Sequence, residues 1–140
     1  MKHIFIGIDP DIHKSGVCAW DRTDKTLDMQ SLSFFQLFDY LSKYKDSINR
    51  VRVEAGWLNE KSNFHTRFNQ TKEAGERIAK NVGANHETGK KIIEMCVYLG
   101  LEVEPVKPLG KITPDYFEKL TGIKCKNQDI IDAAMLVYEL

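Results

Sequence analysis

Residues 4–10 read Ile4-Phe5-Ile6-Gly7-Ile8-Asp9-Pro10, a short apolar run that ends in an acid and a proline. β-branched and aromatic residues bounded by a turn signal predict a buried strand over residues 4–9. A carboxylate at the end of such a strand is costly to bury alone, so Asp9 must be solvated, paired or bound to a metal. Capping of the turn with Pro10 is the simpler explanation for this one residue.

After this run, the spacing of apolar residues changes along the chain between the two-residue period of strands and the 3.6-residue period of helices. Further strands are predicted over residues 15–21, 26–32, 49–54 and 101–106. Helices are predicted over residues 33–44 and 72–98, a short one is predicted to begin at residue 113, and the last is predicted to run from residue 127 or 128 almost to residue 140. Three consecutive strands with short turns indicate an antiparallel meander, and the later crossovers indicate parallel pairs. We therefore expect an α/β fold, a five-stranded mixed sheet with helices on both faces, in one domain spanning residues 1–140.

The composition is that of an ordinary globular protein. The longest apolar runs are a few residues, whereas a membrane span needs about 20, so no membrane partner is expected. The first residues lack the layout of a signal peptide, and Cys18, Cys96 and Cys125 form no C-x-x-C pair. These features predict a reducing, cytoplasmic location and no zinc site.

The net charge is zero, with 20 Lys and Arg against 20 Asp and Glu, which does not suggest a strong nonspecific binder of polyanions. Basic residues are nevertheless in excess over acidic ones in residues 57–91 and 105–127. Residues 57–71 show no clear periodicity and are expected to form a long loop. Its aromatic residues either pack on the body of the protein or on a partner subunit, or stack on unpaired bases. His86 is expected on the surface of the long helix.

Three further acids stand out by position. Glu54 ends the fourth predicted strand, and Asp129 and Asp132 lie three residues apart on the last helix, so they share one face of it. Taken singly, each has an ordinary explanation, such as a solvated strand residue or an acid in the first turn of a helix. Together with Asp9, they could converge at one edge of the sheet.

Such a cluster has a chemical reason to exist. Carboxylates placed close together repel and raise one another's pKa, and divalent cations remove that conflict. Mg²⁺ prefers oxygen ligands, and two ions about 3.5–4 Å apart can orient a water and stabilise the leaving oxygen of a phosphodiester. The four acids therefore predict a metal-dependent nuclease.

The sequence resembles the RuvC-type Holliday-junction resolvases of the RNase H-like superfamily. The resemblance begins with Ile6-Gly7-Ile8-Asp9-Pro10 and Ser15-Gly16, continues with Val53-Glu54, and ends with Asn127-Gln128-Asp129-Ile130-Ile131-Asp132-Ala133-Ala134. Residues 80–89 and Val106-Lys107 are also similar, so nearly the whole chain is covered in order. Asp11 departs from the pattern, because the family usually has glycine there; it is either an extra group near the metal or a turn residue.

The resemblance implies an RNase H-like fold and a crossover junction endodeoxyribonuclease active in DNA recombination and repair. It implies that Asp9, Glu54, Asp129 and Asp132 are catalytic and hold two Mg²⁺ ions, with Mn²⁺ able to substitute. Lys107 matches a family lysine that contacts the scissile phosphate. The implied partners are four-way DNA junctions and, because symmetric cleavage needs two sites, a second copy of the chain. The lysines expected at DNA are Lys80, Lys90, Lys91, Lys107 and Lys111, for each of which solvation is the ordinary alternative.

Other activities remain open at this point. A related nuclease would act on flaps or RNA–DNA hybrids, and a protein that has kept the fold without cleavage would only bind nucleic acid. An actin-like ATPase is disfavoured, because the chain is too short for two lobes and has no Gly-rich phosphate loop. No nucleotide cofactor is therefore expected.

Overall fold

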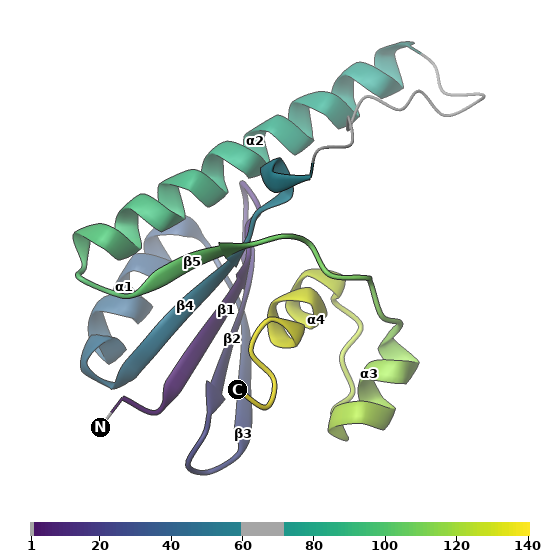
Figure 1. Ribbon diagram of the computed structural model, residues 1–140. Helices are drawn as coiled ribbons and strands as arrows, with labels where there is room; N and C mark the ends of the chain where they lie inside the picture. Colours follow the sequence, from purple (N-terminus) through teal and green to yellow (C-terminus); the bar gives the residue numbers. More distant parts are fainter. Residues whose placement is uncertain (1, 60–71) are drawn as a thin grey trace.

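A computed structural model of the protein describes residues 2–59 and 72–140 (Figure 1). The strands are β1 (Ile4–Asp9), β2 (Ser15–Asp21), β3 (Thr26–Leu32), β4 (Ile48–Glu54) and β5 (Val103–Val106). The helices are α1 (Phe34–Tyr44), α2 (Lys72–Tyr98), α3 (Pro114–Thr121) and α4 (Gln128–Met135), with short 3₁₀ turns η1 (Lys45–Ser47) and η2 (Gly56–Leu58).

The strands form one mixed sheet in the order β3-β2-β1-β4-β5. β1 pairs antiparallel with β2, and β2 with β3, whereas β1, β4 and β5 run parallel. The five-stranded mixed sheet predicted from the sequence is confirmed. Because β1 and β4 are parallel neighbours, with Ile8 opposite Val53, the acids that end these strands lie at the same edge.

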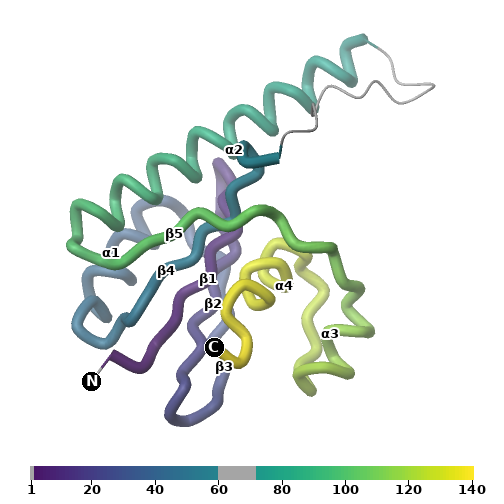
Figure 2. Tube along the Cα trace, viewed as in Figure 1, coloured from purple at the N-terminus to yellow at the C-terminus, as the bar shows by residue number. Residues whose placement is uncertain are grey.

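Helices cover both faces of the sheet, as predicted (Figures 1 and 2). On one face α1 and α2 pack over a core that includes Ile6, Ile8, Val51, Val53 and Ile92. On the other face α4 lies mainly on β1, β2 and β3, and α3 stands beside it. This second core contains Phe5, Trp20, Phe117, Ile131 and Leu136.

The helix starts follow their sequence signals. Ser33 caps α1 in a reciprocal capping box with Gln36, as its position before the helix predicts. Thr113 caps α3, with Pro114 in its first turn, and Gly122 ends that helix at φ 78°.

Two predicted boundaries are wrong. The last helix ends at Met135 instead of running almost to residue 140, because the chain tightens into i→i+3 hydrogen bonds, such as Leu136 N to Ala133 O at 3.2 Å. Leu136 and Val137 are buried there, so packing determines where the helix stops. The fifth strand begins at Val103, two residues later than predicted. Most of the predicted loop 57–71 lies outside the described residues.

None of the helices in residues 2–59 and 72–140 combines the length and the apolar character needed to cross a lipid bilayer.

Candidate metal centre

Three carboxylates from separate elements meet at the carboxyl edge of the sheet. Asp9 ends β1, Glu54 ends β4, and Asp132 lies in α4. Each contributes one carboxylate oxygen to a group of three oxygens that lie within 4.8 Å of one another. They line a cavity of about 370 Å³ together with Asp129 and Asp11. The structure therefore brings all four predicted acids to one cavity, three of them in the closest group.

A close approach between α4 and β2 helps to place the helix. A Cβ at Gly16 would overlap the backbone oxygen of Asp129, so only glycine allows the first turn of α4 to lie this close to the strand. Asn127 caps the same turn, because its Oδ1 accepts a hydrogen bond from Ile130 N at 3.2 Å. The position of Asp129 and Asp132 is thus fixed by backbone contacts as well as by the cap.

The acids strongly disfavour one another's ionisation. Burial, followed by the neighbouring Glu54, raises the pKa of Asp9 to about 10. Burial also raises the pKa of Glu54 and of Asp129, and nearby Asp11 and Asp132 add to the effect on Asp129. At neutral pH and without a cation, Asp9 is therefore protonated and hydrogen-bonded to the Glu54 carboxylate.

The donor set fits a hard divalent cation. Within the described residues, Glu54 Oε2 is buried and has no hydrogen-bond partner. An unpartnered buried carboxylate oxygen is costly, and a cation at this point would satisfy it while removing the repulsion. The group of carboxylates offers oxygen ligands, which suits Mg²⁺ or Mn²⁺ better than a metal that prefers sulfur or nitrogen.

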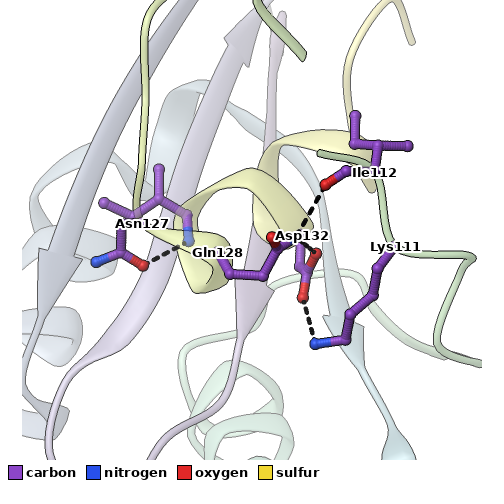
Figure 3. Close-up of polar contacts among 6 residues, drawn as sticks. Lys111, Ile112, Asn127, Gln128 and Asp132 are labelled. Atoms are coloured by element: carbon purple, nitrogen blue, oxygen red, sulfur yellow. Dashed lines mark hydrogen bonds and ion pairs between the residues drawn. The ribbon is translucent and has the colours of Figure 1, made fainter. Parts of the chain in front are cut away.

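Asp132 is held from two sides (Figure 3). Gln128 Nε2 donates to Asp132 Oδ1 at 2.8 Å and to the backbone oxygen of Ile112 at 3.3 Å. Lys111 Nζ lies 3.3 Å from Asp132 Oδ2. Partial burial lowers the pKa of Lys111, but Asp132, with help from Glu54 and Asp9, outweighs it and raises the pKa. Lys111 thus partly neutralises the acids in the metal-free protein.

The predicted lysines do not gather at the centre as a group. Among the described residues that line the cavity, Lys111 is present and Lys107 is not; Lys107 is exposed on the segment that follows β5. Lys90 and Lys91 are exposed on α2 and pair with Glu87 and Glu94. Lys80 is exposed further along the same helix.

Part of the cavity wall comes from residues that the sequence did not mark as functional. Val82, Asn85 and His86 of α2 line it together with the acids. His86 Nε2 would lie 2.6 Å from a Cβ at position 56, so the imidazole rests against Gly56. His86 lies on the helix as expected, but it is partly buried against Gly56 and is not fully exposed. The spacing of 82, 85, 86 and 89, which places these residues on one helical face, is the signal that could have found this wall.

Trp57 is packed against this wall. Its ring meets His86 edge-on with centroids 6.0 Å apart, and a Cβ on Gly89 would come within 2.7 Å of it. Trp57 thus packs on the body of the protein, one of the roles expected for the aromatic residues of 57–71, while it also lines the cavity. The other aromatic residues of that segment lie outside the described residues.

Asp11 has a clear local role. Its Oδ1 accepts a hydrogen bond from His13 N at 2.8 Å, and its own N donates to Ser15 Oγ at 3.1 Å, so it stabilises the β1–β2 turn. Asn85 Oδ1 accepts from Ile12 N at 3.0 Å and ties this turn to α2.

Comparison with known proteins establishes the fold. No protein-family model and no curated protein matches the sequence. Among solved structures, T. thermophilus RuvC in complex with Holliday junction substrate is similar with a TM-score of 0.51 at 12% identity, over 93% of this chain and 87% of that chain. The yeast mitochondrial Holliday junction resolvase Ydc2 gives a TM-score of 0.32 at 12% identity, over 84% of this chain and 57% of that chain. The chain thus has the RNase H-like fold of RuvC, as the sequence predicted.

Proposed function

We propose that this protein is a metal-dependent endonuclease that cleaves branched DNA, with four-way junctions as its substrate. The observation that supports this is the convergence of Asp9, Glu54 and Asp132, with Asp129 beside them, at the carboxyl edge of an RNase H-like sheet. The fold is similar to that of RuvC, which was solved with a Holliday junction substrate. We also propose that residues 1–140 act as one domain and that two copies act together, since symmetric cleavage needs two sites.

Asp9, Glu54, Asp129 and Asp132 would hold two divalent cations, Mg²⁺ or Mn²⁺. When bound, these ions would activate a water for attack on the phosphodiester and stabilise the leaving oxygen. Gln128 keeps the Asp132 carboxylate oriented by its 2.8 Å hydrogen bond. Proton loss from Asp9 would accompany loading of the site, because a carboxyl group must be ionised to act as a ligand.

Lys111 is better placed than Lys107 to contact the reacting phosphate. Its ammonium group already lies inside the cavity, 3.3 Å from Asp132 Oδ2. Once cations neutralise Asp132, Lys111 would be released to bind a phosphate oxygen as a point charge. The role of Lys107 at the scissile phosphate stays a prediction.

The experiment is cleavage of a synthetic four-way junction with Mg²⁺ or Mn²⁺. The wild-type protein should give paired, symmetric nicks, and Asp9→Asn should reduce the rate by at least about 100-fold, since several kcal/mol of transition-state stabilisation depend on the ions. Asp46→Asn, at an exposed acid of η1, is the matched control and should cleave normally.

Other outcomes would redirect the proposal. Cleavage of flaps or RNA–DNA hybrids in preference to junctions would favour a related nuclease of the same fold. Binding with no cleavage under either metal would favour a protein that only binds nucleic acid. Equal activity of Asp9→Asn and wild type would mean that the acidic centre does not carry out the cleavage.

A further inference from the structure

A second cavity, of about 410 Å³, is separate from the acids and is lined by arginines. Arg22, Arg50 and Arg52 line it together with Phe5, Asn49 and Glu104. Arg50 lies opposite Phe5 near the amino ends of β4 and β1, whereas the candidate metal centre lies at the carboxyl ends of the same strands. The two cavities therefore occupy opposite ends of the sheet.

The charges in this cavity do not balance. Glu104 is the acid among the described lining residues, and it pairs with the guanidinium groups of Arg50 and Arg52. Its Oε1 lies 2.9 Å from Arg52 Nε and 3.7 Å from Arg50 Nη1. Because each guanidinium carries five N–H donors, most donors of Arg50 remain available to a ligand. The side chains that line the cavity carry three positive charges against one negative charge, and Arg22 already donates to Leu140 O, so an anion would bind mainly at Arg50 and Arg52.

Two of the arginines are already fixed in place. The guanidinium of Arg22 lies 4.5 Å from the centroid of the Phe5 ring, and its Nε donates to Leu140 O at 2.7 Å. Arg52 also donates from Nη1 to Leu136 O at 2.6 Å. Little side-chain entropy would be lost when these groups bind a ligand, and planar guanidinium forks match the oxygens of a phosphate.

The same face of β4 connects the two cavities. Arg50, Arg52 and Glu54 alternate with the buried Val51 and Val53, so they share one face of the strand. Arg50 and Glu54 are four residue steps apart along the strand, about 13 Å at roughly 3.3 Å per residue. Consecutive phosphates of one strand lie further apart than the axial rise of about 3.4 Å per nucleotide, so this span corresponds to fewer than four nucleotides. A nucleic acid held at the acids can thus reach the arginines.

We propose that the cavity formed by Arg22, Arg50 and Arg52 binds a backbone phosphodiester of the DNA, a few nucleotides from the phosphate at the acidic centre. This inference rests on the proposed function for its ligand, but none of its residues belongs to the acidic centre. The proposed phosphate contact lies on one face of β4 and in the turn after β2. It is separate from the lysines of α2 and of residues 107–111.

The test measures binding of a labelled four-way junction by fluorescence anisotropy between about 50 and 200 mM salt, in the Asp9→Asn protein so that cleavage does not interfere. Arg50→Gln should weaken binding several-fold and reduce the slope of log K against log salt by about 0.9, the value for one lost phosphate contact. Arg50→Lys should keep the slope. Lys45→Gln, at an exposed lysine of η1, is the matched control and should change neither quantity.

A variant expected to bind the junction more tightly distinguishes the loss of a phosphate contact from misfolding. Glu104→Gln removes the negative charge from the cavity while keeping a hydrogen-bonding side chain, so it should tighten binding and steepen the salt slope. Loss of structure could not produce that gain. If Arg50→Gln lowers the melting temperature, the Glu104→Gln result decides, and unchanged or weaker binding by Glu104→Gln overturns the proposal.

The outcomes separate this inference from the proposed function. If the wild-type protein cleaves junctions but Arg50→Gln binds them like Lys45→Gln, the arginine cavity serves another ligand, such as an acidic protein segment, and the inference is wrong. If nothing is cleaved but junction binding depends on Arg50, the phosphate site at the arginine cavity is supported and the nuclease proposal fails. Absence of junction binding by every variant overturns the inference.

Discussion

Gly7 of β1 lies directly against the backbone of Ala133 in α4, so that a Cβ at position 7 would overlap the Ala133 carbonyl oxygen. No side chain separates strand from helix at this point. Asp132 is the neighbour of Ala133, and Asp9 lies two residues beyond Gly7. The contact therefore sets how closely the acid on the helix approaches the acid on the strand.

Substitution of Gly7 tests this relationship. Gly7→Ala should destabilise the protein by about 1–3 kcal/mol, because a buried methyl group would push α4 off β1. It should also reduce cleavage of the junction more than the loss of folded protein explains, since Asp132 moves with the helix. Thermal unfolding and cleavage rates at equal folded concentration check both expectations.

Gly83→Ala is the matched control for that substitution. Position 83 lies within α2, and nothing lies within 4 Å of a Cβ placed there. The substitution should stabilise the protein by about 0.5–1 kcal/mol, as expected for an open helical position. A Gly7→Ala protein as stable and active as Gly83→Ala would mean that α4 does not depend on this contact.

The stability of the metal-free protein should fall as pH rises. The pKa of Asp9 is raised from 3.8 to about 10, so the folded state keeps a proton that the unfolded chain releases above pH 4. The stability from this group is full below pH 4 and is lost as pH rises toward 10, with a slope of at most about 1.4 kcal/mol per pH unit. Melting temperatures from pH 5 to 9 in EDTA measure this, and Asp9→Asn should flatten the curve.

Addition of Mg²⁺ or Mn²⁺ should reverse that loss. A cation that binds the folded state displaces the Asp9 proton, so the rise in melting temperature should be larger at pH 8 than at pH 6. Asp9→Asn should show little rise at either pH. An equal rise in wild type and Asp9→Asn would place the bound cation elsewhere.

Gln128 should matter for metal affinity although we do not expect it to be a ligand. Its Nε2 donates to Asp132 Oδ1 at 2.8 Å, so Gln128→Ala would leave that carboxylate free to turn. Metal affinity should fall by about 10- to 100-fold, as is typical when a group that orients a ligand is removed. Titration with Mn²⁺ measures this, and Gln30→Ala on β3 is a control that should leave the affinity unchanged.

Lys111 and Lys107 should behave differently. Lys111→Gln removes a cation 3.3 Å from Asp132, so less metal should be needed for half-maximal cleavage. At saturating metal its cleavage rate should fall by roughly tenfold through the lost phosphate contact. Lys107→Gln should have a smaller effect on both quantities. The reverse order would restore Lys107 as the lysine at the reacting phosphate.

Much of the fold could be predicted from local patterns. The run over residues 4–9, the meander and the later crossovers determined strand types and directions, and Ser33 and Thr113-Pro114 marked helix starts. The end of α4 could not be predicted in this way, because the apolar pattern continues through Leu136 and Val137. Both residues are buried, and the chain leaves the helix in order to pack them.

The candidate site was predictable to the extent that it follows from topology. Parallel strands end at one edge, which brings Asp9 and Glu54 together, and helical spacing joins Asp129 to Asp132. The catalytic role of these acids stays a prediction. Their partners Gln128 and Lys111, and the wall that carries His86, depend on how α2 and the segment after β5 pack, which no local pattern reveals.

The order of these elements along the polypeptide has a consequence for protein synthesis. Asp9 and Glu54 are translated early, whereas Asp129 and Asp132 are translated only with α4, after all five strands of the sheet. A nascent chain that stops before residue 127 carries half of the carboxylates and leaves one face of its sheet without α4. The nuclease activity proposed above would therefore require translation to pass that helix, and a product that stops before it should not cleave DNA.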